Sequence, residues 1–297
     1  MRRRAFLMTA AAVPALPALH AAPAKPSKSG MRLGVITQIG KDPDAGIKRV
    51  KDLGFATCQI YAGEAAPETA RRVKDALAKY GIEGTSVIAG GPGPEIYNFY
   101  DGPKTLGLVP REYRKARIAA IKKTSEFAKI AGIPGVQTHC GFIPESPNNP
   151  VFEELVAALR EVAAYCKQNG QTFRCETGQE TPVTLVRAIQ TANVQGLGVN
   201  LDPANLIMYG KAYPVDWIEF LGPYIRGVHA KDGLYPTGTK ELGREVPIGK
   251  GKVNFPELIR KLKAVNYTGA LTIEREIEGA EQQKDILSAK AFLEKLI

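Results

Sequence analysis

The sequence has little histidine and no paired cysteine motif, and both absences narrow its chemistry. Its 297 residues include three histidines and four cysteines, and no two cysteines form a Cys-x-x-Cys pair. A zinc ribbon is therefore poorly supported. An oxidising compartment would permit disulfides, but the cysteine spacings do not demand any. We expect all four to be buried free thiols, namely Cys58, Cys140, Cys166 and Cys175.

Glycine-rich phosphate turns are also missing. No G-x-x-x-x-G-K-[ST] motif occurs, and the segment after the first predicted strand, ITQIGKDP, has no G-x-G-x-x-G spacing. A P-loop nucleotide site and a dinucleotide-binding open sheet are therefore disfavoured. The run GGPGP at 90–94 lacks that spacing too, and it follows the third predicted strand. We interpret it as an active-site loop.

Positive charge is in excess but is not concentrated. The formal net charge is +10, and three of the arginines lie at the extreme N-terminus, at 2–4. The other lysines and arginines are scattered through helical patterns and form no dense basic stripe. A solvated surface explains this distribution better than a nucleic-acid interface does. We therefore expect no nucleic-acid partner.

The only extended apolar stretch lies near the N-terminus, and it is too short and too rich in alanine and proline to span a membrane. It follows the sequence RRAFL, which resembles the twin-arginine export signal. We predict a signal peptide at 1–24, a flexible leader at 25–30, a periplasmic or secreted mature protein, and no membrane segment in that mature form. A plain secretory signal, or an internal start at Met31, is the alternative.

From residue 31 onward, short apolar runs alternate with longer amphipathic segments. Eight strand–helix units of about 33 residues each, with no linker between them, predict one α/β domain at 31–297, a single (β/α)8 TIM barrel. The predicted strands cover 32–37, 56–61, 82–90, 135–141, 172–177, 196–202, 226–232 and 270–276. The predicted helices cover 44–53, 67–80, 111–131, 152–169, 183–192, 215–221 and 255–265, with a last helix that ends near 296.

Side-chain alternation along the last four predicted strands places a polar residue of each on the inward face. Glu176, Asp202, His229 and Glu274 occupy these positions, one on each strand. Because the active sites of such barrels lie at the carboxyl ends of the strands, we expect the four side chains to converge there. Arg174 shares the inward phase of Glu176, and an internal salt bridge is the only role that the sequence suggests for it.

Three carboxylates and one imidazole in one confined mouth would repel one another if nothing else were bound. Like charges a few ångströms apart raise one another's pKa strongly, and a divalent cation would remove that penalty. The donor set is mostly oxygen, which favours one Mn²⁺, Mg²⁺ or Co²⁺ ion, with Zn²⁺ as an alternative. For one such residue alone, a strand-end cap or an ion pair explains it equally well. Four residues in phase on successive strands favour a shared ion.

The motifs ETGQE, LDPAN, VHAKD, VPIGKGKVNF and LTIERE occur in the order found in the xylose-isomerase-like barrels, a group of sugar phosphate isomerases and epimerases. The resemblance extends from about residue 31 to the C-terminus. It implies that Glu176, Asp202, His229 and Glu274 are the metal ligands. In the epimerases of the group, the first and last of these glutamates also exchange the substrate proton, so the resemblance implies catalytic roles for Glu176 and Glu274.

The resemblance also implies the reaction, a metal-dependent isomerisation or epimerisation of a small-molecule carbohydrate. One carboxylate would remove the proton next to the substrate carbonyl, and the metal would stabilise the enediolate oxygen. Reprotonation on the other face would invert the centre, and on the adjacent carbon it would isomerise the sugar. The sequence departs from the group at Asn205, where the epimerases carry a histidine that contacts substrate. The scarcity of histidine also counts against the three-zinc relative endonuclease IV.

His139 permits a second interpretation of the function. Its phase points it into the mouth, and lyases related to the group use a histidine from this region as a base on 3-keto-glycosides. An exported protein suits such substrates, so cleavage of 3-keto-glycosides by a lyase or hydrolase-type reaction is the alternative to isomerisation. A buried histidine bonded to the backbone is the structural alternative for His139 itself.

Further residues are expected to assist the site. Lys231 shares the inward phase and could hold a substrate oxygen or pair with Glu274, and Asp232 follows it. Asn205 and Tyr61 complete the expected substrate-binding set. A non-catalytic barrel that captures a sugar or a metal, and a homo-oligomeric assembly, both remain open at this point.

Overall fold

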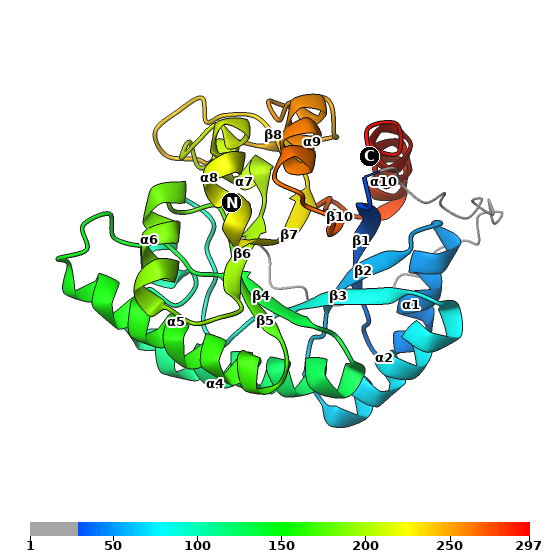
Figure 1. Ribbon diagram of the computed structural model, residues 1–297, viewed down its shortest axis with the longest axis horizontal. Helices are drawn as coiled ribbons and strands as arrows, with labels where there is room; N and C mark the ends of the chain where they lie inside the picture. The colour runs from blue at the N-terminus through cyan, green and yellow to red at the C-terminus, as the bar shows by residue number, and fades with distance from the viewer. Residues whose placement is uncertain (1–28) are drawn as a thin grey trace.

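Short apolar segments form the strands of a closed parallel barrel in the computed structural model, which describes residues 29–297 (Figure 1). The predicted (β/α)8 barrel is confirmed. The order of the strands around the barrel follows the chain, and the last strand pairs with the first, which closes the sheet. The strands are β1 (Arg32–Gln38), β2 (Thr57–Tyr61), β3 (Glu83–Ile88), β4 (Gly135–His139), β5 (Thr172–Glu176), β6 (Leu197–Leu201), β7 (Ile225–Ala230) and β10 (Ala270–Ile273).

Amphipathic helices surround these strands (Figure 1). Most begin with proline in the first turn, where its missing N–H would have no partner inside the helix. Gly81 and Gly132 end two of them with φ of 63° and 75°, which glycine adopts without strain. The long helices are α1 (Pro43–Asp52), α2 (Pro67–Tyr80), α4 (Arg111–Ala131), α5 (Pro150–Gln168), α6 (Pro182–Ala192), α9 (Phe255–Ala264) and α10 (Gly279–Leu293).

The segment between β6 and β7 differs most from the prediction. Instead of one short helix it contains α7 (Pro203–Met208), η1 (Pro214–Trp217), α8 (Ile218–Leu221) and η2 (Gly222–Tyr224). A four-residue helix, α3 (Gly102–Thr105), lies in the loop after β3. After β7, the strands β8 (Asp232–Gly233) and β9 (Glu245–Val246) form a small antiparallel hairpin.

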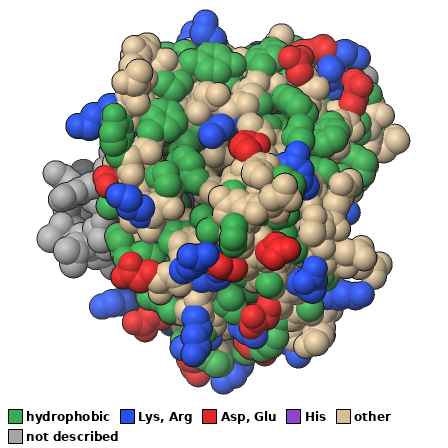
Figure 2. Space-filling view, turned by 90° about the vertical axis from the view of Figure 1, so that its left-hand side faces the viewer, with side chains coloured by type: hydrophobic (Ala, Val, Ile, Leu, Met, Phe, Trp, Pro, Cys, Tyr) green, Lys and Arg blue, Asp and Glu red, His purple; other side chains and the backbone are tan. Residues whose placement is uncertain are grey.

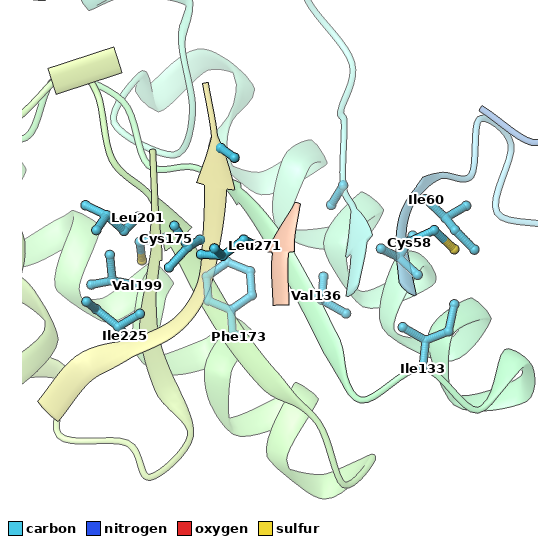
Figure 3. Close-up of a cluster of buried hydrophobic side chains, with 14 of the residues drawn as sticks. Cys58, Ile60, Ile133, Val136, Phe173, Cys175, Val199, Leu201, Ile225 and Leu271 are labelled. Atoms are coloured by element: carbon cyan, nitrogen blue, oxygen red, sulfur yellow. The ribbon is translucent and has the colours of Figure 1, made fainter. Parts of the chain in front are cut away.

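The hydrophobic core lies between the strands and the helices. Phe173, Val199 and Leu201 are fully buried, and Figure 3 shows them with apolar side chains of other strands, among them Ile225 of β7 and Leu271 of β10. Because side chains alternate along a strand, this outward apolar set leaves the polar set facing the interior of the barrel. All four cysteines are buried free thiols, as predicted.

The predicted signal peptide at 1–24, and most of the predicted leader at 25–30, lie outside the described residues. Within residues 29–297, no helix combines the length and the apolar character that a membrane crossing needs. On the face that Figure 2 presents, lysine and arginine side chains are interspersed with aspartate and glutamate and form no single-sign band.

Candidate metal centre

Four side chains meet at the carboxyl ends of β5, β6, β7 and β10. Glu176, Asp202, His229 and Glu274 each offer one ligand atom, and these atoms all lie within 4.8 Å of one another. All four residues are buried, and Asp202 and His229 are fully so. The convergence that side-chain alternation predicts is therefore present in the structure.

The two oxygens of Asp202 have different surroundings. Oδ1 accepts a hydrogen bond from the backbone N–H of Asn205 at 2.8 Å, which caps the N-terminus of α7. Oδ2 is buried and makes no aligned hydrogen bond. The hydroxyl of Thr177 accepts from the N–H of Asp202 and donates to its C=O, at 2.8 and 2.9 Å. These contacts fix the backbone of Asp202 and leave one carboxylate oxygen facing the cluster.

His229 is oriented by the polar interior of the barrel. Its Nε2 lies 2.7 Å from Oε1 of Gln59. Because an amide oxygen only accepts, Nε2 carries the hydrogen and donates. Gln59 is in turn held by Gln137, whose Nε2 donates to the same oxygen at 3.1 Å and whose own oxygen accepts from Ser86 at 2.7 Å. This chain of contacts directs Nδ1 of His229 at the carboxylates.

Nδ1 of His229 lies 3.1 Å from Oε2 of Glu274, and 3.5 Å from both Oε1 of Glu176 and Oδ2 of Asp202. Burial opposes the charged imidazole, but the carboxylates of Glu176 and Glu274 outweigh burial and raise the pKa of His229 well above its usual range. Burial would raise the pKa of Glu176, yet the imidazoles of His139 and His229 hold it at about 2. The carboxylates of the cluster therefore favour a positive charge beside them.

This arrangement fits a divalent cation. Nδ1 of His229 and Oδ2 of Asp202 are buried polar atoms without an aligned hydrogen bond, and such atoms are costly unless something binds them. Three carboxylates and one imidazole nitrogen form a mixed oxygen–nitrogen donor set that suits a hard or borderline ion. A bound cation would replace the proton that Nδ1 otherwise takes up.

Lys231 and Asn205 lie directly beside the cluster. The Nζ of Lys231 is 3.2 Å from Oε2 of Glu274 and 2.9 Å from Oε1 of Glu276. Burial opposes this charge, but the two glutamates raise the pKa of Lys231 well above its usual range, so the ammonium stays protonated. Asn205 bridges the group, since its Nδ2 donates to Glu176 at 3.3 Å and its Oδ1 accepts from Lys231 at 3.4 Å.

His139 also lies at the cluster. Its Nε2 is 3.4 Å from Oε1 of Glu176, and its Nδ1 is 3.3 Å from Nε2 of Gln179. Gln179 donates to the hydroxyl of Tyr209 at 3.2 Å, and the ring of Tyr97 stands edge-on to the imidazole with 5.7 Å between ring centres. These contacts come from side chains, so His139 is not held by a backbone partner as the structural alternative assumed.

Asp232 and Arg174 differ from the predictions, whereas the place of Tyr61 is compatible with its predicted role. Asp232 turns away from the cluster, because its two oxygens accept the backbone N–H groups of residues 233, 249, 251 and 253. The internal salt bridge expected for Arg174 is wrong, since no carboxylate of the described residues pairs with its guanidinium. Tyr61 is half-buried at the end of β2, in register with Gln38 and Ile88, and so lies at the same end of the barrel.

Sequence reasoning missed several residues that shape the site. Gln59 shares the inward phase of Tyr61, so side-chain alternation could have identified it. Glu276 lies two residues after Glu274 in LTIERE, so side-chain alternation would also have placed it on the inward face. Gln179 lies in the loop after β5, where no periodicity applies, and only the three-dimensional structure reveals its contact with His139.

Among curated proteins, the uncharacterized protein MJ1311 of Methanocaldococcus jannaschii is 30% identical to this chain over 196 residues. The match covers 61% of this chain and 64% of MJ1311, so the chain spans less than two thirds of that relative.

Solved structures share the barrel over most of their length. A xylose isomerase domain protein from Planctomyces limnophilus is 33% identical with a TM-score of 0.84, covering 90% of this chain and 97% of its own. The 3-keto-D-glucoside 4-epimerase YcjR from E. coli is 15% identical with a TM-score of 0.68, covering 89% and 99%. A D-psicose 3-epimerase from Clostridium cellulolyticum H10, solved with D-tagatose, is 16% identical with a TM-score of 0.68, covering 90% and 99%. At 15% and 16% identity, the last two structures show only that the fold is shared.

The family assignment rests on a match along most of the chain. Residues 47–296 match the family described as xylose isomerase-like TIM barrel, and this range contains all four residues of the cluster. The chain belongs to the xylose isomerase-like TIM barrel family.

Proposed function

We propose that the protein is a sugar isomerase or epimerase that depends on one divalent metal ion, with Mn²⁺, Mg²⁺ or Co²⁺ favoured and Zn²⁺ as the alternative. The observation that carries the proposal is the ring of Glu176, Asp202, His229 and Glu274, whose ligand atoms lie within 4.8 Å of one another. Two of these atoms are buried without an aligned hydrogen bond. The epimerase structures that share the fold support a small carbohydrate as the substrate.

The ion, when bound, would polarise a substrate carbonyl and offset the negative charge that develops on its oxygen. Glu176 and Glu274 come from non-adjacent strands of the ring, with β6 and β7 between them. They would stand on two sides of the substrate, one removing the proton next to the carbonyl and the other returning it. Lys231, held by Glu274 and Glu276, would donate to a substrate oxygen. Asn205 would hold a second oxygen, and Tyr61 would contact the sugar from β2.

A second candidate reaction is cleavage of a 3-keto-glycoside. The observation that favours it is His139, whose Nε2 lies 3.4 Å from Glu176 and which is held by Gln179 rather than by the backbone. An imidazole at this position could remove the proton beside the keto group and so start elimination of the aglycone. Export through the predicted twin-arginine signal would suit such a substrate, and we propose a periplasmic or secreted location on that sequence alone.

The experiment incubates the metal-loaded protein in D₂O with free keto sugars and, separately, with 3-keto-glycosides. The proposal predicts deuterium on the carbon next to the carbonyl, together with a changed stereocentre or a shifted carbonyl, detected by NMR. Release of the aglycone with each 3-keto-glycoside would identify the second candidate instead. Binding of a sugar with no deuterium exchange into any of the substrates tested would identify a non-catalytic binding barrel.

Variants separate metal binding from proton transfer. Glu274→Gln and Glu176→Gln, tested at metal concentrations that restore full occupancy, should lose about 10²-fold or more in the rate of deuterium exchange. Glu153→Gln, on the outer surface of α5, is the matched control and should exchange at the wild-type rate. If both active-site variants exchange normally while they hold metal, the two glutamates do not carry the proton.

A further inference from the structure

The opposite end of the barrel contains a cavity that the proposed reaction does not use. The cavity has a volume of about 80 Å³, and its lining includes Arg32 and Glu83, the first residues of β1 and β3, and Ala270, the first residue of β10. It therefore opens at the amino ends of the strands, and its lining extends inward to Gln59, which contacts His229. Arg174, Arg226 and Tyr267 also line it.

Arg174 is the unusual member of this lining. Its side chain points into the barrel and the residue is only 7% exposed. Nε donates to the hydroxyl of Thr172 at 3.1 Å and Nη2 donates to the C=O of Thr85 at 3.0 Å. Both partners are neutral, and among the described residues no carboxylate pairs with the guanidinium. Burying an unpaired charge is costly, and burial lowers the pKa of Arg174 to about 10.

Two glycines make room for this guanidinium inside the barrel. A Cβ on Gly135, in β4, would lie 2.6 Å from Nη2 of Arg174, and a Cβ on Gly227, in β7, would lie 3.0 Å from Nη1. Barrel interiors of this type are ordinarily filled by layers of bulky aliphatic side chains. Here the guanidinium of Arg174 occupies the space that these two glycines leave, and the cavity lies beside it.

The other charges around the cavity do not neutralise Arg174. Glu83 is already paired with Arg32, with Oε2 2.5 Å from Nη1. Arg226 adds a further positive charge, and its Nη1 donates to the carbonyls of residues 223 and 225. The hydroxyl of Tyr267 donates to the C=O of Ala270. The cavity is therefore lined by three arginines and one glutamate, and its net charge is positive.

We propose that this cavity binds a small inorganic anion, chloride or phosphate, on the guanidinium of Arg174. Nη1 of Arg174 has no hydrogen-bond partner among the described residues, and it supplies a donor for such an anion. A cavity of about 80 Å³ has room for an inorganic ion of this size but not for a sugar. The bound anion would fill the cavity at the amino ends of the strands and so stabilise the fold. Its binding requires neither the metal nor the proposed reaction.

The test measures the melting temperature of the full chain, with and without metal, in chloride, phosphate and gluconate at equal ionic strength and pH. Gluconate is too large for the cavity and serves as the reference anion. We expect a saturable rise of about 2–4 °C in the anion that binds and none in gluconate. Chloride and phosphate are titrated separately, so the two ligands are distinguished.

Arg174→Met should abolish the anion-dependent rise. Arg160→Gln is the matched control, because Arg160 likewise donates to neutral oxygens, the carbonyls of residues 191 and 192, and lies on the outer helices. If Arg174→Met does not fold, bromide soaked into wild-type crystals gives an independent answer through its anomalous signal in the cavity. Equal melting temperatures in all three salts, together with no bromide peak in the cavity, would mean that water alone solvates Arg174 and would overturn the proposal.

Discussion

At the level of single residues, Gln59 connects the interior of the barrel to His229 of the candidate metal centre. Its amide oxygen accepts from Nε2 of His229 at 2.7 Å, which orients the ring so that Nδ1 faces the carboxylates. Partners of this kind fix the tautomer of a metal-ligating histidine, and their loss typically weakens metal binding 10–100-fold. Gln59→Leu should therefore lower the affinity for Mn²⁺ by about one to two orders of magnitude, measured by isothermal titration calorimetry.

Gln59→Glu provides the control, because it keeps an acceptor for the imidazole N–H at the same place. We expect its affinity for Mn²⁺ to stay close to that of the wild type. Equal losses in Gln59→Leu and Gln59→Glu would show that the acceptor oxygen alone does not position His229, and that the amide NH₂, which donates to Asn200, is needed as well.

Glu180 is a buried acid in the loop after β5. The residue is 1% exposed, and burial outweighs nearby backbone N–H groups and the charge of Lys211 and raises its pKa to about 8. In the unfolded chain its pKa is about 4.3. Between these values the folded state keeps a proton that the unfolded state has lost, so the contribution of Glu180 to stability falls as pH rises. The slope is at most about 1.4 kcal/mol per pH unit.

Glu180→Gln imitates the protonated acid at every pH. We expect its melting temperature to match the wild type near pH 4 and to exceed it increasingly up to pH 8, as measured by calorimetry in parallel pH series. A constant difference between the two proteins across this range would show that the Glu180 carboxylate ionises in the folded state as it does in water.

Residues of the site were predictable where the strand period applies. Because side chains alternate, the sequence places Glu176, Asp202, His229 and Glu274 on one face, and the structure brings them together. The sequence analysis did not predict that one oxygen of Asp202 would cap α7, because it interpreted this residue only as a metal ligand. An aspartate followed by proline is also a helix start signal.

At the level of elements, Asp232 organises the loop between β9 and α9. Oδ1 accepts the N–H groups of residues 233 and 253, and Oδ2 accepts those of residues 249 and 251, all at 2.9–3.0 Å. Asp232→Asn would replace one acceptor oxygen by a donor that faces backbone N–H groups. The free energy of unfolding should fall by roughly 2–4 kcal/mol, measured by urea denaturation.

The exposed Asp216 gives the control, since Asp216→Asn should leave the stability nearly unchanged. Metal stoichiometry in Asp232→Asn should equal that of the wild type, because Asp232 turns away from the cluster. Loss of the metal with unchanged stability would assign Asp232 to the site, as the sequence analysis first supposed.

Long elements were predicted more accurately than short ones. The predicted bounds of α2 and α4 agree with the structure, because a wide apolar face and a terminal glycine mark each of them. The helices between β6 and β7 were not resolved by sequence, since segments of three to six residues are too short to show a period. The hairpin of β8 and β9 has two residues in each strand and depends on the contacts of Asp232 rather than on a pattern.

At the level of the whole molecule, the candidate metal centre draws its side chains from four neighbouring strands of the barrel. An ion that binds only the folded state at about 100 times its Kd stabilises it by about 2.7 kcal/mol. Saturating Mn²⁺ should therefore raise the melting temperature by about 5–10 °C, and excess EDTA should reverse the rise. Asp202→Asn should show almost no response to the ion. An unchanged wild-type melting temperature with each of Mn²⁺, Mg²⁺, Co²⁺ and Zn²⁺ would contradict the proposal that the cluster binds a divalent ion.

The closed barrel itself follows from the alternation of strand and helix signals at regular spacing, and that pattern extends along residues 31–297. What the pattern could not predict is how the interior is filled. The series of side-chain hydrogen bonds from Ser86 through Gln137 and Gln59 to His229 links four strands whose residues are far apart in the sequence. Such contacts depend on the register of the closed sheet, and only the structure supplies it.

The central claim is that one divalent ion is held jointly by four side chains. Anomalous diffraction from crystals grown with Mn²⁺ tests it most directly. We predict one strong peak at the carboxyl ends of the strands, about 2.0–2.4 Å from Nδ1 of His229 and from one oxygen each of Glu176, Asp202 and Glu274. Crystals grown in saturating Mn²⁺ that show no peak among these four residues, with Nδ1 of His229 still paired with a carboxylate, would contradict the claim.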